Sequence, residues 1–265
     1  MNTILWGVVW FCLFGAGFGF LLGMLSKHWR VEQHPKIQKI CELLPGVNCG
    51  GCGYAGCRAL ATAISEKKAA PNACPACDEI KTRQIAEIAG MPTVLRERRR
   101  AQVMCSGTVD HTKRKYVYAG VLDCNAAARL GGGEKICRFG CIGLGTCVEQ
   151  CRFNAIRLVN GVASVDYTRC TGCGVCELSC PKGIIRLIPF DSNYWVGCAS
   201  KDKGAQIRDY CDVGCISCHR CEKICKFGAI TVTDHIASID YKKCVGCGAC
   251  VSVCPRGIIA SGRLK

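Results

Sequence analysis

The sequence lacks the loops that bind nucleotide phosphates. No GxxxxGK(S/T) motif occurs among its 265 residues, so it has no P-loop. Gly51, Gly53 and Gly56 fit the GxGxxG spacing formally, but no apolar strand precedes them and a cysteine interrupts the motif. We therefore predict no catalytic residue in this chain and no site of its own for NAD or flavin.

Charge is absent from residues 4–25, an apolar stretch of 22 residues. As a helix this stretch would be about 33 Å long, which is enough to cross a bilayer. A signal peptide is the alternative, but no basic residue precedes the stretch and no small-x-small cleavage site follows it. Because Lys27, His28 and Arg30 follow directly, the positive-inside rule predicts a single-pass protein of the plasma (inner) membrane, with its N-terminus outside and its body in the cytoplasm.

Cysteine, in contrast, is abundant, with 27 residues in the chain. Such a density indicates either a disulfide scaffold or a metal scaffold. Disulfide frameworks are typical of short secreted chains, whereas these cysteines recur in C-x2-C-x2-C runs, and neighbours this close rarely reach disulfide geometry. The runs therefore predict metal binding by free thiolates in a reducing cytoplasm.

The first motif is PGVNCGGCGYAGC at residues 45–57, followed by APNACPAC. Its glycines let the backbone curl around a cubane cluster and direct amide groups at the cluster's sulfides. We predict one 4Fe–4S cluster here. Its ligands are Cys49, Cys52, Cys57 and Cys74. Structural zinc is the alternative, because four cysteines also bind that ion tetrahedrally.

From residue 124 onward the chain repeats itself with a period of 74 residues. The segments between the cysteines match as well, for example NAIRLVNGVASVDY against GAITVTDHIASIDY. Alternating apolar residues flank Asn160 and Gly161, the strongest short hairpin signal, so each copy is expected to pair two strands beside its clusters. The predicted fold is α+β and ferredoxin-like.

The second copy carries two C-x2-C-x2-C-x3-C runs. This is the pattern of two-cluster bacterial ferredoxins, in which the fourth cysteine of each run ligates the other cluster. One predicted cluster is held by Cys215, Cys218, Cys221 and Cys254. The other is held by Cys244, Cys247, Cys250 and Cys225.

The first copy departs from this pattern, because Leu144 stands where the second copy has Cys218. Cys137 can supply the missing thiolate, which leaves open whether its equivalent, Cys211, replaces Cys218 in the second copy. One cluster of the first copy is then held by Cys137, Cys141, Cys147 and Cys180. Its neighbour is held by Cys170, Cys173, Cys176 and Cys151. The sequence thus predicts five 4Fe–4S clusters in all.

Seven cysteines stay outside these sites. They are Cys12, Cys41, Cys77, Cys105, Cys124, Cys198 and Cys211. Most are expected to be buried thiols, a common state of free cysteine. Cys124 and Cys198 stand one repeat apart, which indicates more than chance without indicating a role.

Acidic residues are few, and the formal net charge is +15. Together with the run RERRR at residues 96–100, this charge would fit nucleic-acid binding. No recognition helix or stacking motif accompanies it, so nucleic acid is not a predicted partner. Clusters with four thiolate ligands are anionic, and we interpret the basic residues as their counter-charges and as a docking face for an acidic electron carrier.

An apolar N-terminal stretch, LPGVNCGGCGYAGC, GGGEKICRFGCIGLGTCVEQC and paired ferredoxin runs follow one another along the chain. Over nearly its whole length this order resembles the B subunit of the Rnf complexes, the ion-translocating ferredoxin:NAD oxidoreductases. The resemblance implies an electron-relay subunit of a translocase, with soluble ferredoxin and the membrane and peripheral subunits of the complex as partners. An iron–sulfur subunit of another membrane redox enzyme, such as a hydrogenase or dehydrogenase, is the alternative.

The expected organisation has five parts. They are a transmembrane anchor at 1–26, a single-cluster domain at 27–92, a linker at 93–123, and ferredoxin-like domains at 124–190 and 191–265. In the single-cluster domain, helices are expected at 58–68 and 78–89. The second of these helices is expected to have an apolar side formed by Ile80, Ile85 and Ile88.

Overall fold

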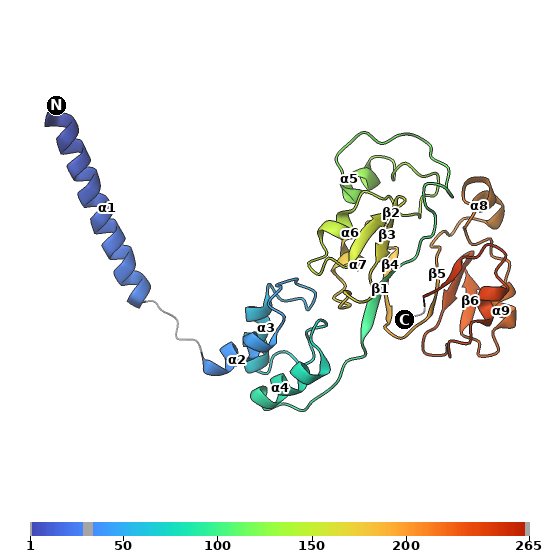
Figure 1. Ribbon diagram of the computed structural model, residues 1–265, viewed down its shortest axis with the longest axis horizontal. Helices are drawn as coiled ribbons and strands as arrows, with labels where there is room; N and C mark the ends of the chain where they lie inside the picture. Colours follow the sequence, from blue (N-terminus) through green and yellow to red (C-terminus); the bar gives the residue numbers. More distant parts are fainter. Residues whose placement is uncertain (1, 29–33, 263–265) are drawn as a thin grey trace.

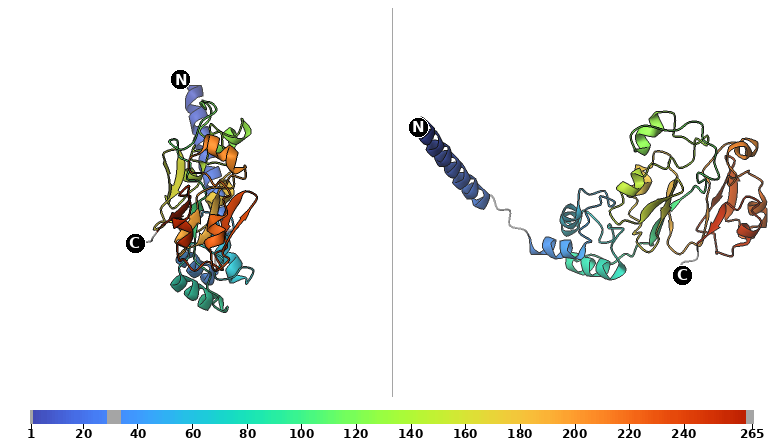
Figure 2. Two further views of the ribbon diagram at one scale, coloured as in Figure 1. Left: turned by 90° about the vertical axis from the view of Figure 1, so that its right-hand side faces the viewer. Right: turned by 45° about the horizontal axis from the view of Figure 1, so that its top comes forward.

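Four parts follow one another along the longest axis of the molecule (Figure 1). They are a long N-terminal helix, a group of short helices, and two groups of strands and short helices, and the right-hand view in Figure 2 shows the same succession. The computed structural model describes residues 2–28 and 34–262. Arg30, part of the expected basic flank, and the last three residues of the expected domain 191–265 lie outside the described residues.

Helix α1 (Asn2–His28) contains the apolar stretch. Within Ile4–Lys27, a window of 18 residues has a mean hydropathy of 2.1, and none of that window is buried against the rest of the chain. The helix predicted from the sequence is therefore present, and it is long and apolar enough to cross a membrane.

The next group is helical. It comprises α2 (Pro35–Leu43), α3 (Cys57–Ser65) and α4 (Glu79–Ala89). Ile40, Leu60 and Ile85 form its core and are almost fully buried. The helices α3 and α4 confirm the two expected in this region, but Ile80 is 71% exposed instead of packing beside Ile85. Five residues along a helix turn the side chain by about 140°, so these two isoleucines face different directions.

The first strand-containing group surrounds two antiparallel pairs. Its elements are β1 (Arg99–Val103), α5 (Cys124–Arg129), α6 (Thr146–Glu149), β2 (Ile156–Val159), β3 (Val162–Val165), α7 (Val175–Ser179) and β4 (Ile185–Pro189). The β2–β3 hairpin turns at Asn160 and Gly161, whose φ angles of 46° and 73° fit the predicted tight turn. The segment 93–123, expected to be a linker, contributes β1, which pairs with β4.

The second group repeats this arrangement. Its elements are β5 (Tyr194–Val196), α8 (Gly204–Tyr210), α9 (Arg220–Ile224), β6 (Ile230–Thr233), β7 (Ile236–Ile239), α10 (Ala249–Ser252) and β8 (Ile259–Ser261). The β6–β7 hairpin is the counterpart of β2–β3, and β5 pairs with β8 as β1 pairs with β4. Both hairpins expected from the repeat are therefore present.

Strand pairing corrects the sequence alignment of the two copies. Val103 lies opposite Ile185, and Val196 lies opposite Ile259, which is one repeat further along the chain. The strands β1 and β5, which precede the cluster runs, are therefore equivalent, although they do not stand 74 residues apart. Cys105 follows Val103 by two residues just as Cys198 follows Val196, so the structural counterpart of Cys198 is Cys105 and not Cys124. The reason is that the connection after β1 is longer than the connection after β5.

Candidate iron–sulfur sites

Four cavities in the described part of the chain are each lined by four cysteines. The space within them amounts to about 400, 360, 360 and 330 Å³. Among the described residues, no three His, Cys, Asp or Glu side chains converge in the way that a single metal ion requires. Zinc needs sulfurs about 2.3 Å from one centre, whereas a cubane spreads its four thiolates over four irons. The donor sets present therefore fit 4Fe–4S clusters.

The first cavity lies in the helical group, and the four cysteines predicted from the first motif line it. They are Cys49, Cys52, Cys57 and Cys74. Gly50 and Gly53 have φ angles of 73° and 83°, a left-handed backbone that glycine adopts without strain. The side-chain oxygen of Asn48 accepts a 2.8 Å hydrogen bond from the Cys57 amide and fixes the loop at the start of α3. The sequence thus folds this loop around a shared space.

The Cys74 thiol has a thiolate-stabilising neighbour. A hydrogen bond from the Cys77 side chain lowers the pKa of Cys74 to about 6, and backbone amides of residues 76 and 77 act in the same direction. The same hydrogen bond raises the pKa of Cys77, which stays the proton donor. Because iron is ligated by the thiolate, this pair favours Cys74 as the ligand.

In the second copy, one cavity is lined by the four cysteines predicted for its first cluster. They are Cys215, Cys218, Cys221 and Cys254. Cys211 does not line this cavity. Of the two alternatives that the sequence left open, the geometry therefore favours Cys218 over Cys211.

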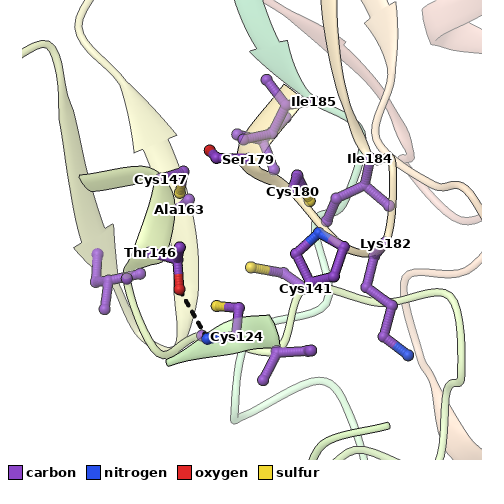
Figure 3. Close-up of a pocket in the computed structure, with 16 residues that line it drawn as sticks. Cys124, Cys141, Thr146, Cys147, Ala163, Ser179, Cys180, Lys182, Ile184 and Ile185 are labelled. Carbon is purple, nitrogen blue, oxygen red and sulfur yellow. Dashed lines mark hydrogen bonds between the residues drawn. The ribbon is translucent and has the colours of Figure 1, made fainter. Parts of the chain in front are cut away.

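In the first copy, the structure brings together a different set from the predicted one (Figure 3). The cavity is lined by Cys124, Cys141, Cys147 and Cys180. Cys137 lies in a separate cavity, with Cys105, Cys198 and Cys211. The proposed ligand set of this site is revised accordingly, with Cys124 in place of Cys137.

Helix α5 positions Cys124 at this cavity. The Asp123 carboxylate caps the helix by accepting a 2.7 Å bond from the Ala126 amide, and it also accepts a bond from the Thr146 hydroxyl. The oxygen of that hydroxyl accepts a 2.7 Å bond from the Cys124 amide (Figure 3). Thr146 is the neighbour of Cys147 on α6, so the network ties two of the lining cysteines together. The only sequence signal for this role was an unassigned cysteine outside the compact run.

The remaining two predicted sets are also brought together. Burial raises the pKa of the Cys176 thiol to about 12, and the nearby Cys173, Cys170 and Cys151, together with Cys147 of the adjacent site, add to the effect. In the second copy, Cys250 lies near Cys244, Cys247 and Cys225, and burial, aided by these thiols, raises its pKa. Each set therefore gathers around one place, as the two-cluster pattern predicts.

The helical group contacts the first copy at two neighbouring sites. A side chain at Gly51 would meet the Cys173 carbonyl oxygen at 2.5 Å, so the two loops touch backbone to backbone. Phe153 of the first copy lines the cavity of Cys49. The Cys49 thiol in turn contributes to the raised pKa of Cys173, whose main cause is burial. The sites of these two parts are thus adjacent.

Cysteine-lined cavities beside paired hairpins, repeated along one chain, define an iron–sulfur protein of the ferredoxin type. Family models agree with this class. Residues 44–76 match a model described as a putative Fe-S cluster, and residues 140–185 and 214–258 match models described as 4Fe-4S dicluster domains.

Similar proteins of known identity narrow the class to one family. The chain is 41% identical over 249 residues to the B subunit of the ion-translocating oxidoreductase complex of Methanosarcina acetivorans, covering 92% of this chain and 94% of the relative. It is 41% identical to the B subunit of the Na(+)-translocating ferredoxin:NAD(+) oxidoreductase complex of Acetobacterium woodii, covering 98% and 78%. For the proton-translocating counterpart of Clostridium ljungdahlii the identity is 37%, covering 98% and 93%. The chain therefore belongs to the family of Rnf complex B subunits, which confirms the resemblance.

Proposed function

We propose that the chain relays electrons through 4Fe–4S clusters between soluble ferredoxin and the membrane redox subunits of an ion-translocating ferredoxin:NAD oxidoreductase. Membership of the family makes it an iron–sulfur electron-transfer subunit of such a complex. The observation that carries the finer proposal is the succession of four-cysteine sites, with the Gly51 loop in contact with Cys173. The arrangement is a single-cluster domain followed by two ferredoxin-like domains, with five cluster sites.

The proposed location follows from the N-terminal helix. Helix α1 anchors the chain in the plasma membrane, with the N-terminus outside and the cysteine-rich parts on the cytoplasmic side. The charge-free stretch 4–25 and Lys27 at the C-terminal end of α1 support this orientation. Reducing cytoplasm also keeps the thiols available for cluster assembly.

The chain's own residues bind and tune the clusters, which supply one-electron chemistry when bound. Backbone amides donate hydrogen bonds to ligand sulfurs. Ala155 donates to Cys151 at 3.4 Å, and its equivalent in the second copy, Ala229, donates to Cys225 at 3.3 Å. Such bonds stabilise negative charge on the sulfur and thereby tune the reduction potential. No bond of a substrate is made or broken on this chain.

We expect electrons from ferredoxin to enter at the second ferredoxin-like domain. The Cys218 side chain is exposed, and Arg220, Lys223 and Lys226 on or beside α9 are exposed as well. Changing these three residues to glutamate should lower the rate of cluster reduction by ferredoxin about tenfold or more at low salt, because complementary charge speeds encounter. Raising the salt concentration should slow the wild type steeply and the variant little. Stopped-flow absorbance of the clusters measures both rates.

A triple variant with the same change in net charge provides the control. Lys36, Lys39 and Arg83 are exposed on α2 and α4, far from α9 (Figure 1), and their change to glutamate should leave the rate unaltered. Equal slowing of both variants would assign the effect to net charge and not to a docking face. If only the control variant is slowed, electrons enter at the helical group, with the Cys49 site as the next candidate. If neither variant is slowed, neither basic set guides ferredoxin and the docking proposal is wrong.

A further inference from the structure

We propose a sixth 4Fe–4S site, which lies between the two ferredoxin-like domains. Its ligands are Cys105, Cys137, Cys198 and Cys211. All four lie outside the segments that match iron–sulfur family models, which cover residues 44–76, 140–185 and 214–258. The inference rests on the proposed relay function. It adds a sixth cluster site to the five that were proposed for that function.

The cavity resembles the other sites in size and in its four lining cysteines. Its space of about 360 Å³ equals that of the cavity at Cys218 and falls between those of the other two. Glycines lie against the sulfurs. A Cβ at Gly140 would be 3.5 Å from the Cys137 sulfur, and one at Gly214 would be 3.6 Å from the Cys211 sulfur. The absence of a side chain at these two positions thus leaves space beside the thiols.

A buried lysine supplies positive charge at this cavity. Lys135 lines the cavity and is only 6% exposed, and its ammonium donates to the carbonyl oxygens of Gly107 and Gly161 at 2.8 and 3.0 Å. Within the described residues, Lys135 forms no ion pair with a carboxylate. A buried ammonium without a counter-charge is costly. An anionic cluster held by four thiolates provides that counter-charge.

Hydrogen bonds connect this cavity to the cluster site on each side. The Cys141 amide donates to the Cys105 sulfur at 3.5 Å, and the Cys215 amide donates to the Cys198 sulfur at 3.4 Å. Cys141 and Cys215 each line the neighbouring cavity of their own copy. A cluster here is therefore one hydrogen bond away from a ligand of either neighbour, and it joins the two ferredoxin-like domains into one relay.

The two copies contribute equivalent residues to this site. Cys105 and Cys198 follow equivalent strands, and Cys137 and Cys211 stand one repeat apart. Backbone hydrogen bonds hold the contributing segments together, for example from the Ser106 amide to the Gly197 carbonyl oxygen at 2.8 Å. The paired contribution accounts for cysteines that neither ferredoxin run needs.

The test counts iron, acid-labile sulfide and zinc in the full chain purified without oxygen. Six sites give about 24 iron atoms in the wild type, and Cys105→Ala should reduce this number to about 20. The double variant Cys105→Ala/Cys198→Ala should also hold about 20, because both cysteines ligate one cluster. Combining Cys105→Ala with Cys124→Ala should leave about 16, because these two cysteines serve different clusters. Retention of the other clusters shows that each variant is folded.

Cys41→Ala is the matched control, because Cys41 lines none of the four cavities, and it should keep the wild-type iron content.

If Cys105→Ala does not fold, spin quantification of the fully reduced wild type gives the number of clusters independently. Six clusters are expected, and five would overturn the proposal. An iron content of about 20 that Cys105→Ala leaves unchanged would overturn the sixth site and leave the relay intact. Loss of one zinc ion in Cys105→Ala would overturn the choice of metal. A chain without iron and sulfide would overturn the relay function itself.

Discussion

Replacing Arg100 with leucine is expected to lower the thermal midpoint of the cluster-loaded chain by about 6 to 12 °C, which corresponds to about 3 kcal/mol. Arg100 is fully buried on β1. Its guanidinium donates to the carbonyl oxygens of Phe190 and Ser192 at 3.2 and 2.6 Å, and it lies 3.8 Å from the centre of the Tyr167 ring. Hydrogen bonds from a charged donor contribute about 1.5–3 kcal/mol each, and the carbonyls would lose these donors. Burial of the leucine side chain offsets only part of this loss of stability.

The neighbouring Arg99 provides the control for this experiment. Its side chain is 48% exposed and forms a 3.5 Å ion pair with Glu97, the kind of surface pair that contributes about 0–1 kcal/mol. Arg99→Leu should therefore shift the midpoint by less than about 4 °C. Circular dichroism and the visible absorbance of the clusters follow the two variants. Equal midpoints for Arg99→Leu and Arg100→Leu would show that the buried guanidinium does not stabilise the fold.

Gly51→Val is expected to slow electron transfer between the helical group and the first ferredoxin-like domain by on the order of tenfold, because rates between positioned groups fall steeply with displacement. A Cβ at Gly51 would lie 2.5 Å from the Cys173 carbonyl oxygen and 2.9 Å from the Cys173 Cβ. Both are backbone or near-backbone atoms, so the two parts must move apart. The backbone at Gly51 is not in the left-handed region, so valine does not strain the loop itself.

Freeze-quench paramagnetic resonance after mixing with reduced ferredoxin follows the arrival of electrons at the Cys49 site. The iron content of Gly51→Val should equal that of the wild type, since no ligand is changed. Ala55→Val is the control, because Ala55 is exposed in the same loop and should accept two methyl groups without displacing a neighbour. Unchanged arrival in Gly51→Val would mean that electrons do not cross this contact.

Local patterns in the sequence predicted much of the fold. The charge-free stretch marks α1, and the Asn160–Gly161 turn marks the β2–β3 hairpin, because each of these elements depends on neighbouring residues. The pairing of β1 with β4 was missed, since its partners stand more than 80 residues apart and no local period announces them. That one missed strand also concealed the equivalence of Cys105 and Cys198.

Among the cluster sites, too, those built from residues close along the chain were predicted, and one that depends on a distant residue was not. The cysteines around Cys52 and around Cys218 gather as predicted, because compact runs keep most of their members close along the chain. In the first copy, Leu144 removes the middle cysteine, and the cavity is completed by Cys124 on α5. Choosing between Cys124 and Cys137 required the three-dimensional path of the chain, since both lie before the run.

Metal analysis of the anaerobically purified chain tests the central claim most directly, because the relay depends on 4Fe–4S clusters in its cysteine sites. The five sites of the proposed function predict about 20 iron atoms with an equal amount of labile sulfide, and the inter-domain site raises both to about 24. Zinc should be absent. A colourless chain that carries zinc without sulfide, and that binds nucleic acid in a strongly salt-dependent way, would contradict the account.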